Sequence, residues 1–129
     1  MPSARAELLH VRLPCDSAAP REARRALEQI REIAPVFDDA LLVASELMTN
    51  AILHSGSEPG DEIELRAVLG TGVLVIEVID EGRSDTSPHE RPPDTLSPGG
   101  FGLPVVAAIA RRWGSDRHRG MRVWAELAL

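Results

Sequence analysis

Residues 46–51 (ELMTNA) carry a carboxylate and a carboxamide four positions apart. In a helix, Glu46 and Asn50 would share one face and lie about 6 Å apart along the axis. Asn50 could then supply an oxygen ligand to a hard cation, and Glu46 could accept a proton. The alternative is a polar helix face that is merely in contact with water. The helix by itself does not decide between these interpretations.

Two glycine-containing segments could hold the rest of a ligand. Asp80 follows a strongly apolar segment, where its carboxylate could accept a hydrogen bond from an exocyclic amine, and Gly82 would let the ligand approach the backbone. The alternative is an aspartate that caps a turn or a helix. Residues 99–102 (GGFG) precede an apolar segment with helical spacing, and backbone N–H groups at such a position bind phosphate. A short glycine-rich segment is a weak signal, because flexible loops share it.

Hydrophobic periodicity indicates which elements would position these residues. The second helix should start near Asp38 and Asp39, run to about His54 and end at Gly56. Asp16 and Ser17 are candidates to cap the first helix. The expected elements are strand 6–13, helix 18–33, the helix to His54, strands 62–69 and 73–79, helix 104–113 and strand 120–128. The positions expected to face the core are Ala23, Leu27, Ile30 and Ala34 in the first helix, Leu41, Ala44, Leu47, Met48, Ala51 and Ile52 in the second, and Val105, Val106, Ile109 and Ala110 in the third.

This order predicts an α+β fold, a two-layer α/β sandwich in which a mixed, mainly antiparallel sheet carries three helices on one face. The length of 129 residues predicts a single domain over residues 1–129. Residues 83–99 contain four prolines and no periodicity. A loop of this length inside a compact domain is typical of a lid over a site.

Composition excludes several functions. The chain has no lysine, so a phosphate-binding loop of the G-x-x-x-x-G-K-[ST] type, the lysine of a eukaryotic-type protein kinase and Schiff-base chemistry are all excluded. A net charge of -6 disfavours direct binding of nucleic acid. Cys15 has no internal disulfide partner, and neither a membrane span nor a signal peptide is recognisable. We therefore expect a cytoplasmic protein with no membrane association.

Order, spacing and residue types of these segments resemble the GHKL ATPases, and specifically the small bacterial anti-sigma-factor serine kinases. Residues 46–51 resemble the family's E-x-x-x-N-A box, residues 80–82 its D-x-G box and residues 100–103 its G-x-G-L box. Residues 21–24, 112–114 and 123–127 also fit the family, so the resemblance covers nearly the whole chain. It implies the histidine-kinase-like ATPase fold.

The resemblance also implies roles for these residues. Asn50 would bind the Mg²⁺ that bridges the phosphates of ATP, Glu46 would act as general base towards the γ-phosphate, and Asp80 would accept a hydrogen bond from the adenine amine. The residues that would shape the pocket and hold the phosphates are Gly82, Gly100, Gly102 and Leu103. The implied cofactors are ATP and Mg²⁺.

Two positions depart from the family pattern. Ser84 replaces a frequent glycine, and Arg122 stands where a threonine usually helps to hold adenine. Arg122 could point outward harmlessly or crowd the adenine end.

Three functions compete. The leading hypothesis is a serine/threonine kinase that phosphorylates an anti-sigma-factor antagonist and sequesters a sigma factor, with a homodimer suggested by the resemblance. The second is a catalytically silent binding module of the same fold. The third, the ATPase part of a sensor histidine kinase, fits poorly because the chain has no helix pair that presents a phospho-accepting histidine.

Overall fold

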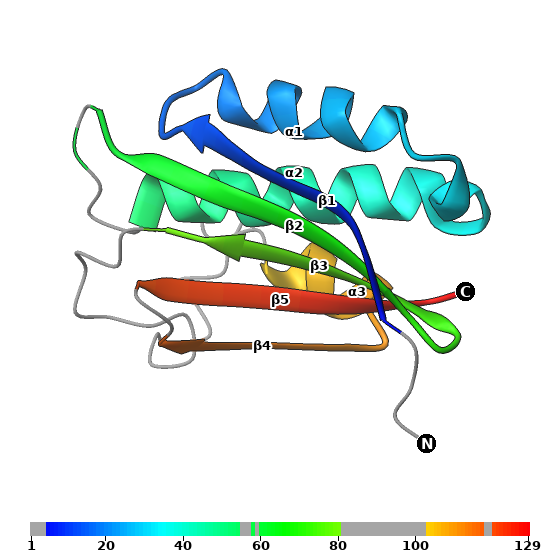
Figure 1. The fold of residues 1–129 in the computed structure, drawn as a ribbon. Coiled ribbons are helices and arrows are strands. Elements are labelled where there is room, and N and C mark those ends of the chain that lie inside the picture. Colours follow the sequence, from blue (N-terminus) through cyan, green and yellow to red (C-terminus); the bar gives the residue numbers. More distant parts are fainter. Residues whose placement is uncertain (1–4, 55–57, 59, 81–102, 118–119) are drawn as a thin grey trace.

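We analysed a computed structural model, which describes residues 5–54, 58, 60–80, 103–117 and 120–129. The described elements form two layers, a sheet and a set of helices (Figure 1). In chain order they are β1 (Ala6–Pro14), α1 (Ala19–Glu28), the 3-10 helix η1 (Arg31–Val36), α2 (Phe37–His54), β2 (Glu62–Gly70), β3 (Val73–Ile79), α3 (Leu103–Ile109), β4 (Arg112–Arg117) and β5 (Met121–Ala128).

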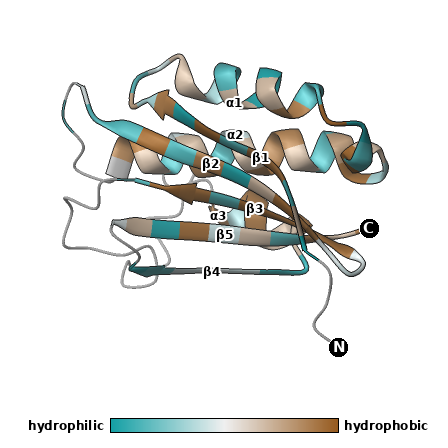
Figure 2. Ribbon diagram, viewed as in Figure 1, coloured by the Kyte–Doolittle hydropathy of each residue, from teal (hydrophilic) through white to brown (hydrophobic). Residues whose placement is uncertain are grey.

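The sheet has the strand order β1-β2-β3-β5-β4, and each of its four pairings is antiparallel. β3 is the central strand, as its apolar sequence predicts, and Figure 2 shows it as predominantly hydrophobic. The β2–β3 hairpin turns through Gly72, whose φ of 70° is the left-handed conformation that glycine adopts without strain. The predicted α+β two-layer fold is confirmed.

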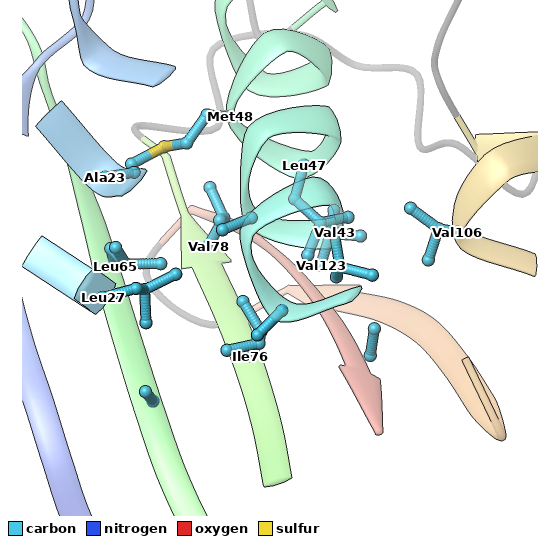
Figure 3. Packing of buried hydrophobic residues seen from close by; sticks show 14 of the residues in the cluster. Ala23, Leu27, Val43, Leu47, Met48, Leu65, Ile76, Val78, Val106 and Val123 are labelled. Carbon is cyan, nitrogen blue, oxygen red and sulfur yellow. The ribbon is translucent and has the colours of Figure 1, made fainter. Parts of the chain in front are cut away.

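The hydrophobic core lies between the sheet and the helices. Leu47 and Met48 of α2 are fully buried, together with Leu65 of β2 and Ile76 of β3. Figure 3 shows how side chains from elements far apart in the sequence share this one cluster. The apolar side of α2 was predicted correctly, because Leu41, Ala44, Leu47, Met48 and Ala51 are buried and Ile52 packs against the cluster. None of the helices in the described part of the chain is long and apolar enough to cross a membrane.

The first helix is shorter than predicted. α1 ends at Glu28, and Ile30 has an extended backbone (φ -102°, ψ 110°) that separates it from η1. Ile33 is therefore the fully buried side chain of this region, while Ala34, which we expected to face the core, is exposed. The helix has no side-chain cap, since Asp16 instead accepts a hydrogen bond from the Ala18 N–H at 2.8 Å.

The prediction of a helix over residues 104–113 is wrong in its second half. α3 ends at Ile109, and Arg112–Arg117 forms an edge strand, β4, that we did not predict. Val106 is buried as expected, but Val105, which we expected to face the core, is exposed. A larger residue in place of Gly114 of β4 would have to displace Trp124, because a Cβ there would lie 2.8 Å from Cζ2 of that side chain on the neighbouring strand.

The sheet face opposite the helices carries a row of alternating charges with one residue from each strand. Arg66 donates to Glu7 at 3.0 Å and to Glu77 at 3.2 Å, and Arg122 donates to Glu77 at 3.1 Å and to Asp116 at 2.6 Å. Glu77, in the middle of the row, is only 7% exposed. Two guanidinium groups thus neutralise a carboxylate that would be costly to bury unpaired.

Candidate functional site

α2 positions the first two candidate residues. Its sequence has few helix breakers, acidic residues in the first turn, and an apolar side that packs against β3 and β5. Glu46 lies between the buried and the exposed side of this helix and is partly exposed. Asn50, one turn further on, is only 4% exposed. The two side chains therefore differ in environment, because the Glu46 carboxylate is in contact with solvent and the Asn50 carboxamide is buried.

The buried carboxamide of Asn50 is unusual. Its Oδ1 atom is buried and accepts no hydrogen bond from any described residue. Leaving a buried acceptor unsatisfied costs about 1–3 kcal/mol, and such groups in native proteins usually have a functional explanation. A carboxamide oxygen is a hard ligand, and Mg²⁺ is commonly bound through one or two protein oxygens together with phosphates and waters. Asn50 therefore fits the role of Mg²⁺ ligand that the family resemblance implies.

Asp80 lies immediately after β3. Its backbone N–H donates to the Met121 carbonyl at 3.0 Å, and its Oδ1 accepts a hydrogen bond from the Met121 N–H at 3.4 Å. These contacts hold the side chain against the start of β5. Asp80 is buried and follows Val78, a core residue, by two positions, so alternation places its carboxylate on the helix side of the sheet.

Leu103 is the first residue of α3 and is almost fully buried, so it anchors this helix in the core. α3 packs against α2, and α2 packs against β3. The structure therefore places α2, which carries Asn50, in contact with β3, which Asp80 follows, and with α3, which begins at Leu103. The three side chains lie on the helix side of the sheet. Gly56, Gly82, Ser84, Gly100, Gly102 and the lid at residues 83–99 lie outside the described residues, and their roles remain predictions.

Arg122 lies on the opposite face of the sheet from Asp80. It pairs with Ile79 across the β3–β5 ladder, and its guanidinium binds Glu77 and Asp116 in the charged row. Burial of the guanidinium lowers its pKa, but hydrogen bonds and charge interactions with Glu77 and Asp116 outweigh that effect and raise the pKa of Arg122 above its ordinary value. Of the two orientations that the sequence left open, the outward one is observed.

Replacing Arg122 by threonine, the residue that the family resemblance leads one to expect, should therefore leave ATP affinity within about twofold. It should lower the free energy of unfolding by about 1 kcal/mol, because partly exposed ion pairs contribute little to stability and the Glu77 carboxylate still pairs with Arg66. Isothermal titration calorimetry and urea denaturation measure these two quantities. A tenfold gain in ATP affinity would show that Arg122 obstructs the nucleotide after all.

Comparison with known proteins adds independent support. A model of the histidine kinase-like ATPase domain family matches residues 13–126 of the chain. The chain belongs to this family. A search of curated proteins found no match. Membership of the histidine kinase-like ATPase domain family implies ATP binding, usually with Mg²⁺, which agrees with the buried oxygen of Asn50 on α2.

Proposed function

We propose that the chain is an ATP- and Mg²⁺-dependent serine/threonine protein kinase that phosphorylates an anti-sigma-factor antagonist and sequesters a sigma factor. The observation that carries the nucleotide-dependent part is the buried, unpaired Oδ1 of Asn50 on α2. The anti-sigma part is supported by the order and spacing of the E-x-x-x-N-A, D-x-G and G-x-G-L segments. We propose that the chain acts as a homodimer in the cytoplasm.

The residues have distinct roles in this proposal. Mg²⁺, when bound, neutralises charge on the phosphates. Asn50 binds the cation through Oδ1, and Asp80 accepts a hydrogen bond from the adenine amine. Glu46 accepts the proton of the acceptor hydroxyl. Phosphoryl transfer depends mainly on positioning and charge neutralisation, so few reactive side chains are needed.

A phosphotransfer assay tests the proposal directly. We expect purified chain to move the γ-phosphate of radiolabelled ATP to a serine or threonine of the antagonist protein when Mg²⁺ is present, and to fail when EDTA is added. Calorimetry should detect Mg²⁺-dependent ATP binding. The absence of binding at millimolar ATP would instead favour a silent binding module. The departures from the family pattern at Ser84 and Arg122 are what favour that alternative, and Arg122 faces away from Asp80.

A further inference from the structure

The solvent-facing side of α2 exposes two leucines. Leu42 is 41% exposed and Leu53 is 56% exposed, and they are two of only four large hydrophobic side chains that are exposed among the described residues. A single exposed leucine is ordinary and needs no explanation. Here two exposed leucines lie on one side of α2, the helix that also carries Glu46, the candidate general base.

Helical geometry places both leucines beside Glu46. Leu42 precedes Glu46 by four residues and Leu53 follows it by seven, so all three lie within about 40° of one another around the axis of α2 at about 100° per residue. Along the axis, the two leucines lie about 6 Å and about 10.5 Å from Glu46, on opposite sides of it. Asn50 lies at the buried edge of the same face. The face thus has a carboxylate between two apolar positions.

A hollow adjoins this face at Leu42. It has a volume of about 270 Å³ and lies where α1 meets α2. Arg24, Asp38, Leu41, Leu42 and Ser45 line it. Leu41 and Leu42 offer apolar surface, while Arg24 and Asp38 are exposed and provide one charge of each sign. Such a site suits an apolar side chain of a protein with polar groups around it.

We propose that the protein carrying the acceptor serine or threonine docks along this face of α2, with apolar side chains on Leu42 and Leu53. This proposal depends on the proposed kinase function. The acceptor hydroxyl must reach Glu46, and Leu42 and Leu53 are the exposed apolar side chains nearest to Glu46 along this face of α2. In the transfer, the hydroxyl oxygen forms a bond to the γ-phosphorus, the bond from that phosphorus to the β,γ-bridging oxygen breaks, ADP leaves and the proton passes to Glu46.

The test first requires the protein substrate that the wild-type chain phosphorylates. Wild-type chain is incubated with radiolabelled ATP, Mg²⁺ and the proteins of its own cells, and the protein that becomes phosphorylated on serine or threonine is purified. KM and kcat for this protein are then measured for Leu42→Ser, Leu53→Ser and the matched control Leu129→Ser, whose leucine is 46% exposed at the C-terminus. ATP affinity is measured for each variant.

We expect KM for the protein substrate to rise about tenfold in Leu42→Ser and in Leu53→Ser, with ATP affinity unchanged and Leu129→Ser equal to wild type. An unchanged KM in both variants would overturn the docking proposal while the kinase function stood. Conversion of a dimer to a monomer by Leu42→Ser in analytical ultracentrifugation would show that a second copy covers this face, and would also overturn it. If no protein is phosphorylated, the proposed function and the docking proposal both fail.

Discussion

Replacing Asn50 by alanine should weaken Mg²⁺-ATP binding by about 10- to 100-fold, while the free energy of unfolding changes by no more than about 1 kcal/mol. A contact to a charged group is worth about 1.5–3 kcal/mol, which sets the size of the loss in affinity. Stability responds differently, because Oδ1 of Asn50 is buried without a partner among the described residues. Removing it relieves a desolvation cost that offsets the packing lost with the side chain.

Thr49→Ala is the matched control. Thr49 is the neighbouring polar residue of α2, and its hydroxyl donates to the Ser45 carbonyl within the same helix at 2.9 Å. This substitution should leave ATP affinity unchanged. Calorimetry in Mg²⁺ and in EDTA gives the affinities, and urea denaturation gives the stabilities. If Asn50→Ala bound Mg²⁺-ATP normally and lost more than about 2 kcal/mol of stability, the carboxamide would be structural.

Thermal unfolding with added Mg²⁺-ATP tests the role of Asn50 independently of calorimetry. A ligand that binds only the folded state stabilises it by RT ln(1 + [L]/Kd), about 2.7 kcal/mol when the ligand is at 100 times Kd. Wild-type chain and Thr49→Ala should therefore gain stability as Mg²⁺-ATP is added. Asn50→Ala should gain little at the same concentration. A shift in Asn50→Ala equal to that of wild type would contradict its assignment as a Mg²⁺ ligand.

Sequence periodicity was sufficient for the elements at the centre of each layer. It gave β3 with its observed bounds, Val73–Ile79, and the C-terminal end of α2. Both elements lie at the centre of their layer, so burial imposes a regular pattern on their side chains. Two of the three described polar candidates, Glu46 and Asn50, lie in α2, and the third, Asp80, immediately follows β3. Asn50 and Asp80 are buried on the helix side of the sheet.

The edge strand β4 was not predicted, for a physical reason, whereas the other edge strand, β1, was predicted over residues 6–13. β4 pairs with β5 alone, and its sequence RWGSDR is hydrophilic over nearly its whole length (Figure 2). Its conformation depends on pairing with β5, the next strand along the chain, rather than on a hydrophobic pattern of its own. The contact of Gly114 with Trp124 shows how specific this pairing is. Trp113 and Ser115 are two positions apart and therefore share one face of an extended strand. That spacing was the one local signal that could have revealed the strand.

The exposed face of α2 was also missed. The sequence analysis did not single out Leu42 and Leu53, because the helix is apolar over much of its circumference. Only the exposure of each side chain in the fold separates them from core leucines such as Leu47. Their exposure is the observation from which the docking proposal starts.

Replacing Glu46 by glutamine should slow phosphotransfer by about 10²- to 10⁴-fold, the range typical for a general base. Glutamine keeps the size of the side chain and one acceptor oxygen, but its amide nitrogen is a donor and the side chain cannot accept a proton at neutral pH. ATP affinity should stay within about twofold, because Asn50 and Asp80 are unchanged. Glu46 is partly exposed, as a group must be if it receives a proton from a hydroxyl brought by another protein.

Asp39→Asn provides the comparison for charge alone. Asp39 is an exposed carboxylate on the same helix, seven residues before Glu46. If the negative charge of α2 merely steered the substrate, both substitutions would slow transfer to a similar, salt-dependent extent. If Glu46 accepts the proton, only Glu46→Gln will lower kcat, and the deficit will persist at high salt. Single-turnover measurement of phosphoserine formation separates the two, and equal rates for wild type and Glu46→Gln would remove Glu46 from the chemistry.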